Sequence, residues 1–305
     1  MRYRPLGPTG LHVSALGLGG NQFGTTCDAA QVKRIVDAAL ELGVNFIDTA
    51  EMYGPYKSEE TLGQALRSRW NEVVLCTKTG AGDAPGKLSR KKVFEALEAS
   101  LRRLGTDHVD LYYIHFPDPT TPLDETLRAY EDLVREGKIR YVGISNHAAW
   151  QVAEAVGIAR RHDWSPVVVS QDRYNILDRG VEAERIAALE HLGLSLVPYS
   201  PLMSSFLTGK YRQGEAPPPD TRFGRSPRGA AAFAQVGRPE VFAKLDTWRA
   251  FAEERGHTMA ELAIAWLLAH PVVCSVIAGV TKPEQVAANA KAAEWELSLD
   301  EVKEL

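Results

Sequence analysis

The feature that most constrains the fold of this chain is a regular alternation of short apolar runs with longer amphipathic segments. The short runs have the length and composition of buried parallel strands, and the longer segments place apolar residues at helical spacing. Strands are predicted at residues 15–19, 44–48, 73–77, 109–115, 139–144, 167–171, 194–199 and 272–277. Helices are predicted at residues 29–42, 57–69, 89–103, 122–136, 148–162, 181–192, 258–269 and 283–292. Eight such units favour one α/β domain over residues 1–305, a single (β/α)8 TIM barrel, rather than an open doubly wound sheet.

Two segments depart from this alternation. Residues 2–5 and 11–14 flank the turn signal Gly7-Pro8-Thr9-Gly10, so we expect an N-terminal β-hairpin. After the seventh strand, residues 200–240 contain Pro217-Pro218-Pro219 and several glycines, which predicts a long loop followed by an extra helix at 240–255. Loops of this length in compact domains are usually functional or disordered.

Composition limits the kinds of partner and compartment. The formal net charge of −4 gives no bulk attraction to nucleic acid or to an anionic membrane. No apolar run approaches the roughly 20 residues of a membrane span, and the first residues lack the apolar core of a signal peptide. The three widely spaced cysteines argue against a disulfide framework or a zinc site. We therefore expect a cytoplasmic protein that binds neither nucleic acid nor membrane and holds no metal.

Four ionisable residues are predicted at one rim of the barrel. In barrel enzymes the chemistry lies where the strands end, so residues at those ends are the candidates for catalysis. Asp48 ends the second strand, Lys78 follows the third, and His115 ends the fourth. Tyr53 lies in the loop after the second strand. Neighbouring strands should therefore present an acid, an ammonium, an imidazole and a phenol to one mouth.

These four groups suit the delivery of a proton to a developing alkoxide. Lys78 near Tyr53 is expected to favour the phenolate and to lower the pKa of Tyr53. Asp48 would hold Lys78 charged and oriented, and His115 would orient a carbonyl oxygen or share its proton. Such groups fit the reduction of a carbonyl. No side chain can supply a hydride, so the reaction would require a nicotinamide or a similar cofactor.

Two long stretches of the chain match a known family. Residues 43–54 read Gly-Val-Asn-Phe-Ile-Asp-Thr-Ala-Glu-Met-Tyr-Gly, and residues 58–63 continue with Ser-Glu-x-x-Leu-Gly. Residues 97–112 read Leu-x-x-Ser-Leu-x-x-Leu-Gly-x-Asp-x-Val-Asp-Leu-Tyr, and His115 follows. Both stretches resemble signatures of the aldo-keto reductase family, and the match runs nearly from end to end.

The resemblance implies a barrel reductase with a catalytic tetrad. The tetrad would consist of Asp48, Tyr53, Lys78 and His115. The 200–240 loop, with Leu207-Thr208-Gly209-Lys210-Tyr211, is similar to the branch that includes bacterial general reductases and potassium-channel β subunits.

The resemblance also implies a cofactor, NADPH or less often NADH, bound across the barrel mouth without a Rossmann fold. In agreement, no G-x-G-x-x-G motif follows a predicted strand. The implied cofactor residues lie where the later strands end. Ser145, Asn146 and Gln171 would hold the carboxamide, Tyr199 would stack on the nicotinamide, and Ser200, Pro201, Leu202, Gly209 and Lys210 would line the pyrophosphate. Gly279, Thr281, Lys282, Gln285 and Asn289 would form the adenosine site, where Lys282 would pair with a 2′-phosphate and favour NADPH.

Two hypotheses of function remain open, and a third is disfavoured. The leading one is an NADPH-dependent oxidoreductase that reduces small-molecule aldehydes or ketones to alcohols. The alternative is a nicotinamide-sensing regulatory or binding subunit with slow turnover, which would keep the same tetrad. A metal-dependent barrel hydrolase would need a cluster such as His-x-His at the rim, whereas the eight histidines are scattered. The sequence carries no signal for an oligomeric state.

Overall fold

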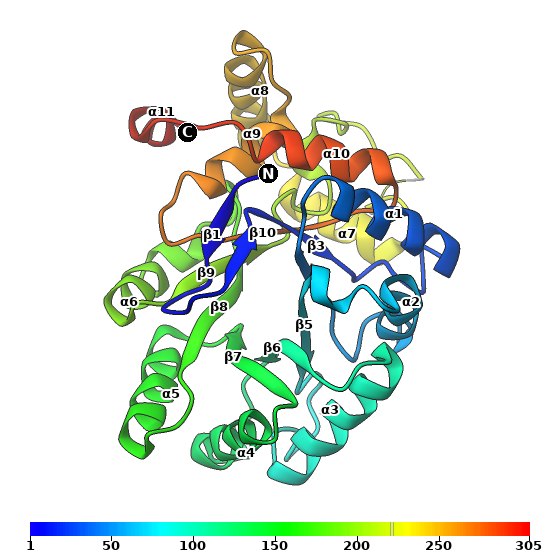
Figure 1. Ribbon diagram of the computed structural model, residues 1–305. Coiled ribbons are helices and arrows are strands. Elements are labelled where there is room, and N and C mark those ends of the chain that lie inside the picture. Colours follow the sequence, from blue (N-terminus) through cyan, green and yellow to red (C-terminus); the bar gives the residue numbers. More distant parts are fainter. Residues whose placement is uncertain (220, 222) are drawn as a thin grey trace.

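Within residues 1–219, 221 and 223–305, which the computed structural model describes, eight parallel strands close into a barrel. Figure 1 shows them at the centre of the molecule, where the last strand pairs with the first. The barrel strands are β3 (Leu16–Gly19), β4 (Phe46–Asp48), β5 (Val74–Thr79), β6 (Val109–Ile114), β7 (Ile139–Ser145), β8 (Val167–Arg173), β9 (Ser195–Tyr199) and β10 (Val276–Gly279). The predicted barrel is confirmed.

An N-terminal hairpin covers the end of the barrel where the strands begin. Its strands, β1 (Tyr3–Pro5) and β2 (His12–Ser14), pair in antiparallel fashion. Leu6 and Val13 are fully buried against the side chains that fill the barrel interior. Gly7 N donates a hydrogen bond to Ser195 Oγ at 2.9 Å, at the start of β9. The predicted hairpin is therefore confirmed, and it leaves the opposite end of the barrel free for a site.

Helices surround the barrel (Figure 1). They are α1 (Ala29–Glu41), α2 (Lys57–Leu66), α3 (Arg90–Leu104), α4 (Leu123–Arg135), α5 (Ala149–His162), α6 (Arg185–Leu192), α7 (Pro227–Val236), α8 (Pro239–Glu254), α9 (Met259–Leu268), α10 (Pro283–Ala292) and α11 (Leu299–Glu304). Short 3-10 helices are η1 (Trp70–Glu72), η2 (Gly180–Glu182) and η3 (Phe206–Thr208). Among the residues described, no helix combines the length and the apolar character needed to cross a membrane.

The alternation of side chains along each strand decides which residues reach the mouth. Phe46, Val74, Cys76, Leu111 and Tyr113 belong to the cluster that fills the barrel interior. Successive side chains of a strand point to opposite faces, so positions two further along also face the interior. Residues 48, 78 and 115 share this parity and lie at the ends of β4, β5 and β6. The same rule directs residues 145, 171 and 199 inward from the ends of β7, β8 and β9.

Two expectations about the last third of the chain are wrong in detail. The eighth strand was expected at 272–277, but β10 covers Val276–Gly279 because its partner β3 begins only at Leu16. The segment expected to be a loop at 200–240 contains η3 and α7. Its glycines and prolines suggested a loop, although Ser226 followed by Pro227 is also a helix start, and Ser226 Oγ accepts from Gly229 N. Residues 220 and 222 of this segment lie outside the described residues.

Two helical glycines provide a test of the packing around the barrel. A Cβ atom at Gly63 in α2 would lie 2.4 Å from the backbone oxygen of Leu104 at the end of α3. We expect Gly63→Ala to destabilise the fold by about 1–3 kcal/mol, because the two helices would have to separate. The measurement is the midpoint of urea denaturation.

The matched control is Gly157→Ala in α5, where an added Cβ meets nothing within 4 Å. Alanine should stabilise this helix by about 0.5–1 kcal/mol. The two midpoints should therefore move in opposite directions, and a Gly63→Ala protein as stable as its parent would contradict the close contact of α2 with α3.

Candidate active site

A cavity of about 630 Å³ opens at the end of the barrel where the strands finish. Residues that end or follow β3, β4, β6, β7, β8, β9 and β10 line it. In a (β/α)8 barrel this is the face on which active sites lie. The cavity is therefore the candidate active site, and three of the four tetrad residues, Asp48, Tyr53 and His115, line one end of it.

Lys78 and Asp48 form a buried ion pair next to this cavity. Lys78 Nζ donates to Asp48 Oδ2 at 2.6 Å and to the backbone oxygen of Thr49 at 2.8 Å. The side chain of Lys78 is 0% exposed and that of Asp48 is 3% exposed. Burial alone lowers the pKa of Lys78, but nearby acidic groups, with the charge of Asp48 first, outweigh burial and raise that pKa above its usual value. The amine is therefore held as an ammonium in the barrel interior.

Tyr53 and His115 stand next to this pair. Lys78 Nζ lies 5.0 Å from the centroid of the Tyr53 ring. The rings of Tyr53 and His115 meet edge to face, with 5.9 Å between their centroids. Tyr53 reaches this position from a turn after β4, in which its backbone N–H donates to Ala50 O at 3.0 Å. The structure thus brings together the four predicted residues, three of them at the ends of different strands and Tyr53 in the turn after β4.

The protonation states of Tyr53 and His115 follow from their burial. Burial raises the pKa of Tyr53 above 10, although Lys78 acts in the opposite direction. Lys78 lowers this pKa, as expected, but desolvation of the phenolate is the larger effect, so the pKa stays above its usual value. Burial, with the nearby charges of Lys78 and Lys87, lowers the pKa of His115 to about 3. At neutral pH the site holds a phenol with its proton and an uncharged imidazole.

Asn146 connects the tetrad to the wall formed by β9. Its backbone has φ 60, in the left-handed region that asparagine tolerates better than most residues. Asn146 Nδ2 donates to His115 O at 3.0 Å, and Asn146 Oδ1 accepts from the Tyr199 hydroxyl at 2.9 Å. On the other side, Gln171 Nε2 donates to Asp48 Oδ1 at 2.9 Å. Amide side chains thus hold both the histidine backbone and the aspartate in place.

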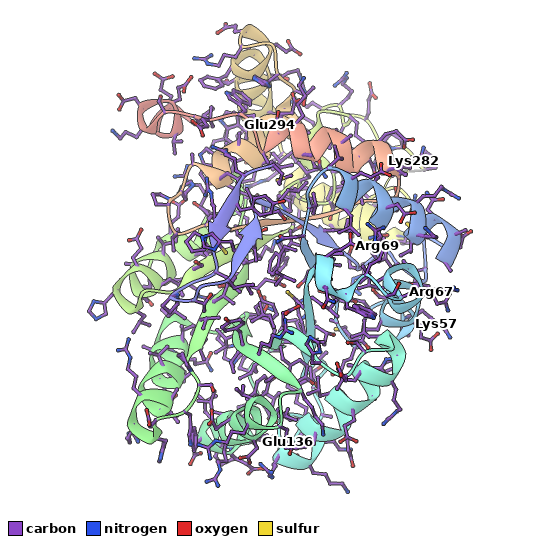
Figure 2. The ribbon with its side chains drawn as sticks, in the orientation of Figure 1. Lys57, Arg67, Arg69, Glu136, Lys282 and Glu294 are labelled. Carbon is purple, nitrogen blue, oxygen red and sulfur yellow. The ribbon has the colours of Figure 1, made fainter. Side chains whose placement is uncertain are left out.

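The far end of the cavity lies at the N-terminus of α10. Figure 2 shows Lys282 there, and this residue is the N-cap of the helix. Gln285 Oε1 accepts hydrogen bonds from Thr281 N at 2.7 Å and from Lys282 N at 3.2 Å. Lys210 and Arg225 also line the cavity. Positive side chains and a helix N-terminus together favour an anionic group at this end.

Most of the predicted site residues line one cavity. The lining includes Asp48, Tyr53, His115, Ser145, Asn146, Gln171, Tyr199, Ser200, Pro201, Leu202, Lys210, Gly279, Thr281, Lys282 and Gln285. Three described residues of the prediction do not line it: Lys78 lies buried beside Tyr53, Gly209 ends η3, and Asn289 is buried in α10.

Several lining residues were missed from the sequence. They are Gly19, Gly20, Asn21, Gln22, Met52, Phe116, Ser204, Ser205, Thr221, Arg225, Ile277 and Ala278. Asn21, Gln22 and Phe116 follow closely on the ends of β3 and β6, a signal that could have found them. Arg225 comes from the irregular segment before α7, which contains no comparable sequence signal.

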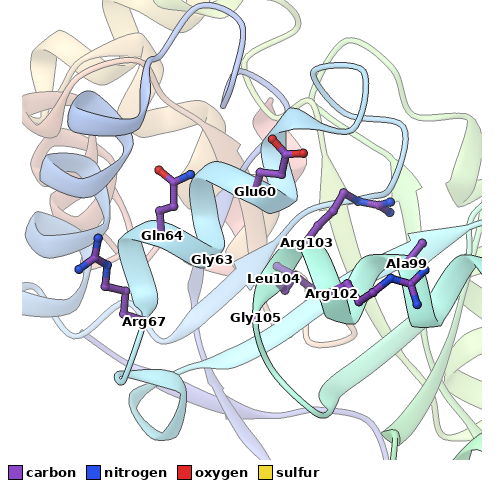
Figure 3. Close-up of a pocket in the computed structure, with 9 residues that line it drawn as sticks. All are labelled: Glu60, Gly63, Gln64, Arg67, Ala99, Arg102, Arg103, Leu104 and Gly105. Atoms are coloured by element: carbon purple, nitrogen blue, oxygen red, sulfur yellow. The ribbon is translucent and has the colours of Figure 1, made fainter.

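A second concave region lies away from the strand ends. It is an open groove of about 690 Å³ between α2 and α3, and Figure 3 shows side chains of both helices along it. Glu60, Gln64 and Arg67 come from the α2 side, and Arg102 and Arg103 from α3. No residue of the tetrad lines this groove, so its volume does not make it the active site. Among the residues described, no cluster of histidine, cysteine and acidic side chains could hold a metal ion.

Comparisons with known proteins agree with this geometry. The family model described as "Aldo/keto reductase family" matches residues 15–305. The chain is 40% identical over 301 residues to the "Probable voltage-gated potassium channel subunit beta" of Oryza sativa subsp. japonica. This alignment covers 96% of this chain and 91% of the relative. It is 36% identical over 317 residues to the "Uncharacterized oxidoreductase YrpG" of Bacillus subtilis (strain 168), and this alignment covers 98% of this chain and 93% of the relative. It is 33% identical over 308 residues to the "L-glyceraldehyde 3-phosphate reductase" of Escherichia coli (strain K12), and this alignment covers 96% of this chain and 87% of the relative.

These relatives are of the two kinds that the sequence resemblance indicated, channel β subunits and bacterial reductases. Each match spans nearly the whole barrel, so the likeness extends to the strands that carry the site and not to an isolated motif. The chain belongs to the aldo/keto reductase family.

Proposed function

We propose that this protein is an NADPH-dependent oxidoreductase that reduces aldehydes or ketones to alcohols. One observation carries the proposal: the partly buried phenol of Tyr53 borders the cavity, with the Lys78 ammonium 5.0 Å from its ring. Such a phenol can give up a proton, and the ammonium stabilises the phenolate that remains. The two bacterial relatives, one named an oxidoreductase and the other a reductase, support the same reaction class.

Each tetrad residue has a separate part in the proposed reaction. Tyr53 is the general acid that protonates the carbonyl oxygen as it becomes an alkoxide. Lys78, held by Asp48, stabilises the charge that develops on the Tyr53 oxygen. His115 Nδ1 is buried and has no hydrogen-bond partner among the described residues. With its proton on Nε2, the neutral ring would instead donate to the carbonyl oxygen and orient it.

The residues of the cavity fit a nicotinamide cofactor. When bound, NADPH would supply the hydride that no side chain can supply. Ser145, Asn146 and Gln171 would hold its carboxamide, beside a Tyr199 ring whose hydroxyl is fixed at 2.9 Å by Asn146. The residues proposed for the pyrophosphate are Ser200, Pro201, Leu202, Gly209 and Lys210, and those proposed for the adenosine phosphate end are Gly279, Thr281, Lys282, Gln285 and Asn289.

Apolar side chains beside the tetrad suit a small carbonyl substrate. Met52 and Phe116 line the cavity next to Tyr53 and His115. The Phe116 ring stacks on His115 with 4.6 Å between centroids. Three free, buried cysteines fit a reducing compartment, so we place the reaction in the cytoplasm.

A second candidate function is a nicotinamide-sensing subunit with slow turnover. It is favoured by the relatives named potassium channel subunit beta, one of them 40% identical to this chain. An assay with NADPH and a reactive aldehyde separates the two. Turnover much slower than dissociation of the cofactor, with a protein partner that co-purifies, would favour the second candidate.

The first prediction concerns Tyr53→Phe. With NADPH and a reactive aromatic aldehyde, the purified protein should lose absorbance at the nicotinamide band. Removal of the phenol oxygen should slow this loss by about 10²–10⁴-fold, because no proton donor remains, while the affinity for NADPH is kept. Tyr56→Phe, the same change at an exposed tyrosine of the same turn region, should be without effect. A Tyr53→Phe enzyme that keeps its activity would contradict the proposed mechanism.

The charge of His115 can be tested by pH titration. Its pKa is about 3 in the folded protein, against about 6.5 for an unfolded histidine. We expect its ring nitrogens to keep the nuclear magnetic resonance shifts of a neutral imidazole between about pH 7 and pH 5. Folding stability should decrease as the pH falls below about 6.5, because only the unfolded chain binds this proton. A ring that titrates near pH 6.5 would refute the assignment of a neutral histidine.

Lys282→Ala tests the preference for NADPH. Loss of an ammonium that pairs with a 2′-phosphate should weaken NADPH binding by about tenfold and leave NADH binding nearly unchanged. Fluorescence titration with each cofactor measures both affinities. Lys291→Ala is the matched control, since Lys291 lies on the same helix but pairs with Glu261 at 3.5 Å. If the binding of NADPH and of NADH were weakened equally, Lys282 would not pair with the 2′-phosphate.

A further inference from the structure

The side chain of Glu51 joins two parts of the site that carry different members of the tetrad. Glu51 lies in the turn after β4, two residues before Tyr53, and is partly buried. Thr79 Oγ1 donates to Glu51 Oε1 at 2.8 Å, and Gly80 N donates to the same oxygen at 3.2 Å. Thr79 is the last residue of β5 and directly follows Lys78. The Glu51 carboxylate therefore ties the turn of Tyr53 to the strand of Lys78.

Backbone hydrogen bonds hold only the first part of this turn against β5. Thr49 N donates to Cys76 O at 3.0 Å, and Glu51 N donates to Lys78 O at 3.3 Å. In the part of the chain that the structure describes, no backbone hydrogen bond joins residues 52–56 to β5. Along the chain toward Tyr53, Glu51 is thus the last residue whose backbone N–H or carboxylate is hydrogen-bonded to β5 or to Gly80, which follows it.

We propose that Glu51 is a positioning residue, whose carboxylate holds the Tyr53 turn against β5 and so sets the distance of the Tyr53 hydroxyl from Lys78. The inference rests on the function proposed above. Proton transfer requires heavy atoms within about 2.6–3.2 Å, and a misplacement of about 1 Å can lower a rate about 10²-fold. A link of two hydrogen bonds at this point therefore bears on the rate as well as on stability.

The link needs an acceptor oxygen and not a negative charge. Glutamine at position 51 keeps an oxygen in the same place for Thr79 and Gly80, whereas alanine removes it. Glu51→Gln should therefore preserve the position of Tyr53, and Glu51→Ala should lose it. Thr79→Val removes one of the two donors from the other side of the same link.

The test compares single-turnover rates of NADPH oxidation by an aromatic aldehyde, because release of product can limit steady-state turnover. Glu51→Ala should lower this rate by about 10²-fold, while Glu51→Gln stays within about threefold of the parent. Thr79→Val should lower it less, and the double variant Glu51→Ala, Thr79→Val should be no slower than Glu51→Ala alone. The dissociation constant for NADPH and the KM for the aldehyde should stay nearly unchanged in all of them.

Glu60→Ala is the matched control. Glu60 lies in α2 and pairs with Lys57 at 2.8 Å. Its loss should change neither the single-turnover rate nor the affinity for NADPH. A Glu51→Ala protein that is less stable but reacts at the parental rate would overturn the proposal, since Glu51 would then serve the fold alone.

Crystal structures of Glu51→Ala and Glu51→Gln separate this proposal from the proposed function. If the unaltered protein reduces no aldehyde, the proposed function fails, and the position of the Tyr53 ring still decides the role of Glu51. A ring displaced from Lys78 in Glu51→Ala but not in Glu51→Gln would support the proposal. A ring that is in the same place in both variants would overturn it.

Discussion

The site depends on one buried ion pair, Lys78 with Asp48. Neither charge is stable alone in the barrel interior, and removal of one partner from such a pair typically costs about 3–5 kcal/mol. The pair persists because Lys78 Nζ also donates to Thr49 O at 2.8 Å and because Gln171 donates to the second oxygen of Asp48 at 2.9 Å. The ammonium is thereby fixed where Tyr53 and His115 meet it. Its charge acts in the same sense on both neighbours, because it lowers both pKa values: it opposes protonation of His115 and favours loss of the proton from Tyr53.

The barrel makes this arrangement possible with little special geometry. Residues 48, 78 and 115 alternate in step with the interior-facing residues of β4, β5 and β6, so their side chains converge at the mouth of the barrel. Apolar side chains such as Phe46 and Leu111 fill the barrel below them. The N-terminal hairpin covers the opposite end of the barrel, and the cavity opens where the strands finish. The turn that carries Tyr53 is the less regular part, and side-chain hydrogen bonds to β5 support it.

Much of the fold and of the tetrad could be predicted from the sequence, because strand ends in a parallel barrel converge by necessity. Asp48, Lys78 and His115 needed only correct strand ends, and an error of one or two residues in a boundary did not alter their parity. Residues on irregular backbone were harder. Arg225 reaches the cavity from a segment with no periodic signal, and β10 was misplaced because the apolar run from Val272 to Val280 does not reveal its own register. The raised pKa of Tyr53 also could not be predicted, since burial and the Lys78 charge oppose each other and only packing decides which is larger.

The hydrogen bonds of Asn146 have a consequence for how such a site can change over generations. One side chain supports the backbone of His115 and anchors the hydroxyl of Tyr199, and its own backbone has a positive φ of 60. A different residue at position 146 would have to satisfy all three demands together, and an altered ring at position 199 would act through the same amide on the histidine. In the function proposed above, where Tyr199 contacts the cofactor and His115 orients the substrate, cofactor affinity and the chemical step would be inherited as one trait at this position, and selection for one of them would act on the other.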